Sequence, residues 1–162
     1  MPNYNRPVKR DQRHSSHSNS SQSQRNMGIT QTIVKYIDEN LNDENSKSFK
    51  DYNIRHLVKH AEEFGSYLKN EGVETNQIRK FLDAINQLKT ELAKDNDFTR
   101  IETGVVLLKP KLAYAAARQK AAKPLSQVMS KAIDKVETTQ DFERLVQFIE
   151  SIIAYHKAAG GK

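Results

Sequence analysis

Two stretches of the chain repeat the same spacing of apolar side chains, and this spacing limits the fold more than any other feature. In residues 54–68 and again in residues 78–92, apolar residues stand at offsets 0, 3, 4, 7, 10 and 14. Because an α-helix has about 3.6 residues per turn, these offsets place the side chains on one stripe. Each stretch therefore predicts an amphipathic helix that buries one face.

Similar spacing predicts further helices over residues 29–41, 101–115, 125–136 and 142–153. Proline lacks an amide proton and its ring collides with the preceding turn, so Pro110 requires a kink or a break in the third-last of the predicted helices. Pro124 is typical of a helix start. No segment shows the sustained alternation of a half-buried strand.

The ends of the predicted helices carry recognisable signals. Asp51 is a candidate cap for the helix over residues 54–68, and Gly72 stands where that helix should end. Thr138 and Asp141 have the spacing of a capping box. These signals predict short connections and hence antiparallel neighbours.

The first 26 residues are mostly Ser, Asn, Gln, Arg and His. Such a segment cannot bury enough apolar surface to offset the entropy of ordering, so we expect residues 1–26 to form a disordered basic tail. The tail is either an arm that touches nucleic acid or a solubilising extension. Residues 27–162 are expected to form a single domain, an all-α compact bundle of five to six helices.

Several classes of function are excluded by what the sequence lacks. The chain contains no cysteine, so disulfide scaffolds, thiol nucleophiles and thiolate metal sites are ruled out. Neither a phosphate-binding glycine loop nor a serine-nucleophile motif occurs, and we expect no enzyme and no cofactor. No apolar run approaches the ~20 residues of a membrane span, and the N-terminus lacks a secretory signal. We expect a cytoplasmic protein without membrane contact.

One histidine pair raises the question of a metal site. His56 and His60 lie four residues apart, with Glu63 one turn further, and this spacing can bridge a divalent ion. The zinc-protease pattern needs Glu directly after the first His, where this chain has Leu57. Two histidines on the solvent-exposed edge of a helix are the preferred interpretation, and no metal is expected.

The positive charge of the chain is unevenly distributed. The formal net charge is +6, and residues 103–133 alone contain six basic and no acidic residues. A run of 31 residues without an acid is unusual for an ordinary mixed surface. It favours binding to a polyanion or to an acidic partner. The basic residues of this run are Lys109, Lys111, Arg118, Lys120, Lys123 and Lys131.

Within this run, the block LLKPKLAYAAAR at residues 107–118 is the best candidate binding site. If a helix begins at Pro110, then Lys111, Tyr114 and Arg118 share one stripe. Lysine and arginine contacts to phosphates give affinity for RNA of any sequence. Tyr114 either contacts the ligand or packs at the edge of the core.

Arg79 and Lys80 form a second candidate, near the start of the helix over residues 78–92. Asp83 is close enough in the sequence to pair with either, so local spacing favours a surface ion pair there. Because such pairs are weak, at ~0–1 kcal/mol, the two cations remain available to a phosphate.

The sequence resembles the small subunit of the type III-A CRISPR effector, the Csm complex. Three blocks carry the likeness: QIRKFLDAINQLK at residues 77–89, LLKPKLAYAAAR at 107–118 and FIESIIAYHKAAGGK at 148–162. The likeness runs from about residue 54 to the C-terminus and leaves the N-terminal tail uncovered.

The resemblance implies a small helical protein without catalytic activity that stacks in several copies along the crRNA and target RNA. Its implied partners are these RNAs, the backbone and large polymerase-like subunits, and copies of itself. The implied role is in antiviral defence. Carried over to this sequence, the RNA-binding residues are Arg79, Lys80, Lys109, Lys111 and Arg118, and Lys120 extends the basic run. The alternative is a helical scaffold subunit that contacts only proteins and never RNA.

Overall fold

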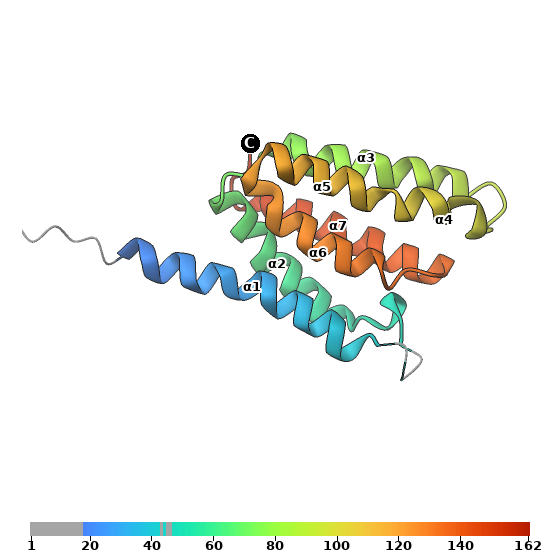
Figure 1. Cartoon of the computed structure of the whole chain (residues 1–162), viewed down its shortest axis with the longest axis horizontal. Helices are drawn as coiled ribbons and strands as arrows, with labels where there is room; N and C mark the ends of the chain where they lie inside the picture. The colour runs from blue at the N-terminus through green and yellow to red at the C-terminus, as the bar shows by residue number, and fades with distance from the viewer. Residues whose placement is uncertain (1–17, 43, 45–46) are drawn as a thin grey trace, which may run out of the picture.

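The structure, a computed structural model, describes residues 18–42, 44 and 47–162, with side chains from residue 28 onward. This part of the chain contains seven α-helical segments, two short 3-10 helices and no strand, so the predicted all-α class is confirmed (Figure 1). Because Leu107 alone separates α4 from α5, the two form one kinked helix, and the number of helices agrees with the five to six predicted. In chain order the segments are α1 (Ser18–Asn40), η2 (Phe49–Asp51), α2 (Ile54–Asn70), α3 (Thr75–Leu92), α4 (Thr99–Val106), α5 (Leu108–Arg118), η3 (Lys120–Ala122), α6 (Lys123–Ile133) and α7 (Thr139–Ala158).

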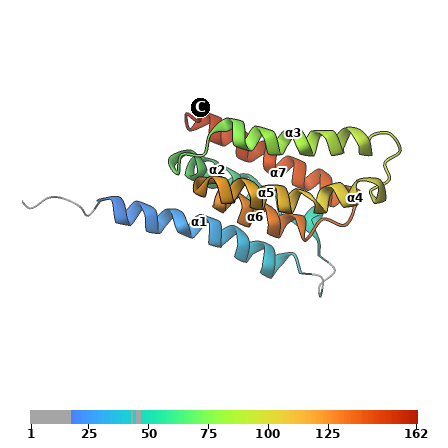
Figure 2. The same ribbon diagram turned by 45° about the horizontal axis from the view of Figure 1, so that its top comes forward.

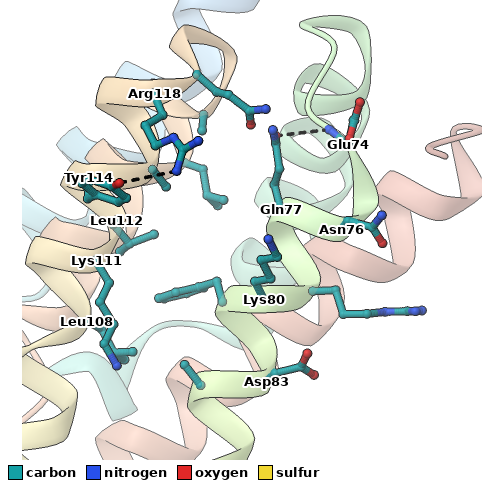
Figure 3. A pocket seen from close by; sticks show the side chains of 17 residues that line it. Glu74, Asn76, Gln77, Lys80, Asp83, Leu108, Lys111, Leu112, Tyr114 and Arg118 are labelled. Atoms are coloured by element: carbon teal, nitrogen blue, oxygen red, sulfur yellow. Dashed lines mark hydrogen bonds between the residues drawn. The ribbon is translucent and has the colours of Figure 1, made fainter.

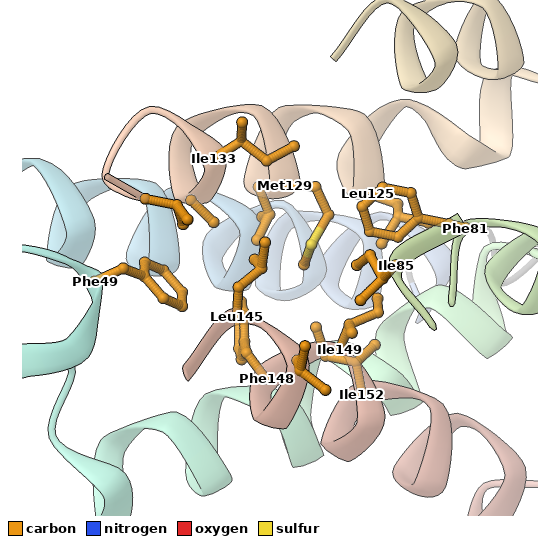
Figure 4. Close-up of a cluster of buried hydrophobic side chains, with 14 of the residues drawn as sticks. Phe49, Phe81, Ile85, Leu125, Met129, Ile133, Leu145, Phe148, Ile149 and Ile152 are labelled. Atoms are coloured by element: carbon orange, nitrogen blue, oxygen red, sulfur yellow. The ribbon is translucent and has the colours of Figure 1, made fainter. Parts of the chain in front are cut away.

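Helix α7 lies at the centre of the bundle. It packs against α2, α3 and η2, while α6 packs against α1 and α5 on the opposite side of the core (Figures 1 and 2). One apolar cluster fills the space between these helices. The side chains labelled in Figure 4 come from η2, α3, α6 and α7. The fully buried members include Phe49, Ile85, Met129, Phe148 and Ile152.

The predicted apolar stripes face this core along most of their length. In α2, Leu57, Phe64 and Leu68 are fully buried. The stripe prediction is wrong for Ile54 and Val58, which are 48% and 38% exposed. Both stand in the first two turns of α2, where the neighbouring Arg55 and His56 side chains also face solvent.

The helix ends follow the predicted signals with one correction. Thr138 and Asp141 form the expected capping box of α7. Gly72, with a φ of 83°, follows the end of α2 in the left-handed region that glycine adopts freely. The cap of α2 is Asn53 rather than Asp51: its side chain accepts hydrogen bonds from the Arg55 and His56 amides, while Asp51 belongs to η2.

The break that Pro110 requires occurs three residues before it, at Leu107. Pro110 consequently stands in the first turn of α5, where the amide groups have no acceptor within the helix. The missing amide proton therefore costs no hydrogen bond. Without this break, the ring of Pro110 would collide with the carbonyl of Val106.

Helix α1 begins at Ser18, inside the segment predicted to be a tail. From residue 28 onward, its buried residues are Ile29, Thr30, Ile33 and Ile37. Its N-terminal end extends past the bundle (Figures 1 and 2). Adding a residue to an existing helix costs far less free energy than nucleating a new helix. The packed half of α1 can therefore extend into the polar residues that precede it. The remainder of the predicted tail, residues 1–17, lies outside the described residues.

Candidate nucleic-acid interface

A groove of about 780 Å³ runs between α3 and α5 (Figure 3). Its floor is apolar: Phe81, Leu108, Leu112 and Leu125 are at most 7% exposed. Its two walls are the first three turns of α3 and the exposed face of α5. The polar residues that line it are Glu74, Asn76, Gln77, Arg79, Lys80, Asp83, Lys111, Tyr114, Arg118 and Gln119.

The wall formed by α5 carries the predicted stripe. Lys111, Tyr114 and Arg118 all line the groove (Figure 3). Arg118 Nη1 donates a hydrogen bond to Tyr114 Oη at 3.4 Å, and the guanidinium carbon lies 5.7 Å from the centre of the tyrosine ring. Tyr114 is 65% exposed, so it is a groove residue and does not pack at the edge of the core.

The wall formed by α3 contributes Arg79 and Lys80. Neither pairs with Asp83, and within the described part of the chain neither has any carboxylate at ion-pair distance. The predicted surface ion pair is therefore wrong, and both cations remain without a carboxylate partner among the described residues. Glu74 and Asp83 lie on the same wall and make it less positive than the wall formed by α5.

Two of the six predicted binding residues lie outside the groove. Lys109 pairs with Asp134 at the end of α6 and is only 35% exposed. This contact turns Lys109 toward α6, away from the face that Lys111 occupies. Lys120 is exposed on η3, beyond the end of α5.

The histidine pair on α2 does not form the expected solvent-exposed edge. His60 is only 8% exposed, and its Nδ1 atom lies 2.7 Å from the hydroxyl of Tyr52. Burial, and secondarily the positive charges of His56 and Lys59, lowers the pKa of His60. Among the described residues, no three His, Cys, Asp or Glu side chains are grouped so that they could hold a metal ion.

Comparison with known proteins identifies the family to which this chain belongs. The family model for Csm2 type III-A matches residues 51–162, which include both walls. The chain belongs to the Csm2 family of type III-A CRISPR systems. This family member carries helix α1 ahead of the matched region.

A relative from Streptococcus thermophilus, described as "CRISPR system Cms protein Csm2", is 30% identical over 101 residues. The aligned part is 60% of this chain and 78% of the relative. No solved structure matches the chain. None of the described helices has both the length and the apolar character needed to cross a membrane.

The sequence analysis did not single out the uncharged residues of the groove. Gln77 stands on its α3 wall, where its side-chain oxygen accepts a hydrogen bond from the Glu74 amide at 3.3 Å. The Glu-x-x-Gln spacing is a local capping signal that could have located this residue. Local spacing predicted that the floor residues are buried, but no local pattern shows that they meet in one floor, because they come from three helices that are separated in the sequence.

Proposed function

We propose that this chain is a non-catalytic small subunit of a type III-A CRISPR ribonucleoprotein, in which the groove between α3 and α5 holds RNA through its phosphates. In this proposal the chain stacks along the crRNA and target RNA, beside the backbone and large subunits and copies of itself. In this proposal the chain acts in the cytoplasm, where it binds and stabilises RNA and catalyses no reaction.

The observation that carries the proposal is the state of the groove cations. Arg79, Lys80 and Lys111 line one groove, and no carboxylate in the described part of the chain neutralises them. By contrast, Lys109 and Lys131 outside the groove pair with Asp134 and Asp38. Unpaired cations that face each other across a groove are available to a polyanion.

RNA fits this arrangement because its phosphates repeat along the strand regardless of sequence. Contacts between cations and phosphates release counterions, which gives affinity that falls with salt and does not depend on base identity. Such binding suits a subunit that must hold guides and targets of any sequence. The acidic side chains of the α3 wall favour a ligand that follows the α5 wall, with Lys111 and Arg118 as its main contacts.

The test is the salt dependence of RNA binding. Replacing Lys111 and Arg118 together by Ala should weaken binding to RNAs of unrelated sequence equally. It should also flatten the slope of log affinity against log salt by about 1 to 2, since each lost phosphate contact removes at most ~0.9. Fluorescence anisotropy with short labelled RNAs measures both quantities.

The matched control removes two cations that lie outside the groove. Lys35 and Lys94 are exposed and pair with Glu39 and Glu91 on the same helix or its end. The Lys35→Ala, Lys94→Ala variant loses the same charge and should keep the wild-type slope. An unchanged slope in the groove variant would favour the scaffold alternative, in which the basic surface meets only protein.

A further inference from the structure

Tyr114 is the one Phe or Tyr side chain that the described part of the chain exposes broadly, with 65% of its surface open to solvent. Its sequence neighbours on α5 are Ala113 and Ala115, and Ala117 lies one turn further along. A methyl side chain is too short to cover an aromatic ring one turn away. The ring therefore stands on the groove wall with much of its surface uncovered (Figure 3).

Arg118 restrains this ring through two weak contacts. Its Nη1 atom donates to the tyrosine hydroxyl, and its guanidinium lies 5.7 Å from the ring centre. Both contacts come from the residue one turn along the same helix, so they do not depend on a partner molecule. A ring held in place in advance loses less conformational freedom when a ligand binds.

The surroundings of the ring determine which ligand it suits. Lys111 and Arg118 lie one turn before and one turn after Tyr114 on the same wall, and Lys80 lies on the opposite wall (Figure 3). Proteins that bind single-stranded nucleic acid combine a cationic groove with an exposed aromatic ring on which a base stacks. Bases inside an RNA duplex cannot reach such a ring, because their faces are covered by their neighbours.

We infer that Tyr114 stacks on an unpaired nucleobase of the bound RNA, while Lys111 and Arg118 contact the phosphates on either side of that nucleotide. This inference rests on the proposed function and adds to it the base contact and the single-stranded character of the bound nucleotide. Every base has a π-face, so the contact tolerates any sequence, as the phosphate contacts do.

The experiment compares two RNA probes that differ only in their bases. One is a labelled 12-nucleotide oligoadenylate, and the other is the same strand with abasic nucleotides at its central positions. The full-length protein should bind the complete strand about tenfold more tightly than the abasic strand, as expected for one stacked base. In Tyr114→Leu this preference should disappear, whereas Tyr114→Phe should retain it because the ring remains.

Two further results make the outcome decisive. Val106→Ala, which trims another exposed apolar side chain outside the groove, should leave the preference unchanged. Equal loss of affinity for both probes in Tyr114→Leu, or no loss for either, would overturn the stacking contact. The proposed function would then still stand if the salt slope of the wild type reports phosphate contacts. Absence of measurable binding to either probe would overturn both.

Discussion

The hydroxyl of Ser48 donates a 2.6 Å hydrogen bond to the carboxylate of Asp141, 93 residues further along the chain. Asp141 is fully buried and also accepts from the amides of Lys50, Glu137 and Thr138. One carboxylate thereby fixes η2 against the start of α7. Burial alone would raise the pKa of Asp141, but these hydrogen bonds outweigh it and hold the pKa below its usual range.

Replacing Asp141 by Ala should therefore destabilise the bundle strongly. The variant leaves several donors without an acceptor, one of them the Thr138 amide of the α7 capping box. We expect a loss of ~3 kcal/mol in the free energy of unfolding, measured by urea denaturation. Asp134→Ala, which removes an exposed carboxylate paired with Lys109, should cost no more than ~1 kcal/mol. Similar costs in both variants would contradict the role assigned to Asp141.

These contacts show where sequence reasoning ends. The helical stripes, the Thr138–Asp141 capping box and the groove stripe of Lys111, Tyr114 and Arg118 all depend on residues within one helix or at its end. Each was predicted, apart from the exposed start of the α2 stripe. The bond from Ser48 to Asp141 joins residues far apart in the sequence, and no local pattern contains it.

One of the predicted cations, Lys109, lies outside the groove. Lys109 and Lys111 stand two residues apart in one basic block, yet only Lys111 lines the groove. Residues two apart point to nearly opposite sides of an α-helix, so Lys109 faces α6. There Asp134, which lies 25 residues away in the sequence, pairs with it through the packing of α5 on α6. Charge density along the chain predicted a binding surface but not which cations the fold would neutralise.

Acidification should weaken the bundle through His60. The pKa of His60 is lowered in the folded state, so the unfolded chain binds more protons below its ordinary pKa of about 6.5. The contribution of neutral His60 to the free energy of unfolding is complete above that pH. It is lost as the pH falls toward the folded-state pKa of His60. Urea midpoints measured between pH 7.5 and about 5 should decline in the wild type.

Two variants separate His60 from the other groups that titrate in this range. His60→Phe retains an aromatic ring but no titratable nitrogen, so its midpoints should depend less steeply on pH, although it also loses the bond to Tyr52. His56→Gln changes an exposed residue and should keep most of the decline. Parallel pH profiles for the wild type and His60→Phe would rule out His60 as the source.

Two glycines in helices should differ in how well they tolerate alanine. A Cβ atom at Gly65 would lie 2.7 Å from both the amide nitrogen of His156 and the carbonyl oxygen of Ile152. These are backbone atoms of α7 and cannot move without shifting that helix, so Gly65→Ala should cost about 1 to 3 kcal/mol despite its better helix propensity.

The matched change is Gly104→Ala in α4. There the new Cβ would meet the flexible end of the Leu88 side chain, which can rotate away. The helix propensity gained, up to ~1 kcal/mol, should offset most of the cost and leave stability nearly unchanged. Thermal unfolding followed by circular dichroism distinguishes the two variants. A Gly65→Ala variant as stable as the wild type would contradict the close approach of α2 to α7.

The most direct test of RNA binding in the groove is chemical footprinting of lysines, with acetylation read by mass spectrometry in the presence and absence of bound RNA. Lys80 and Lys111 should become several-fold less reactive when RNA binds. Lys35 and Lys94, exposed and outside the groove, should react at the same rate in both states. Reactivity of Lys80 and Lys111 that stays unchanged while RNA is bound would contradict the account, because the phosphates would then lie on another surface.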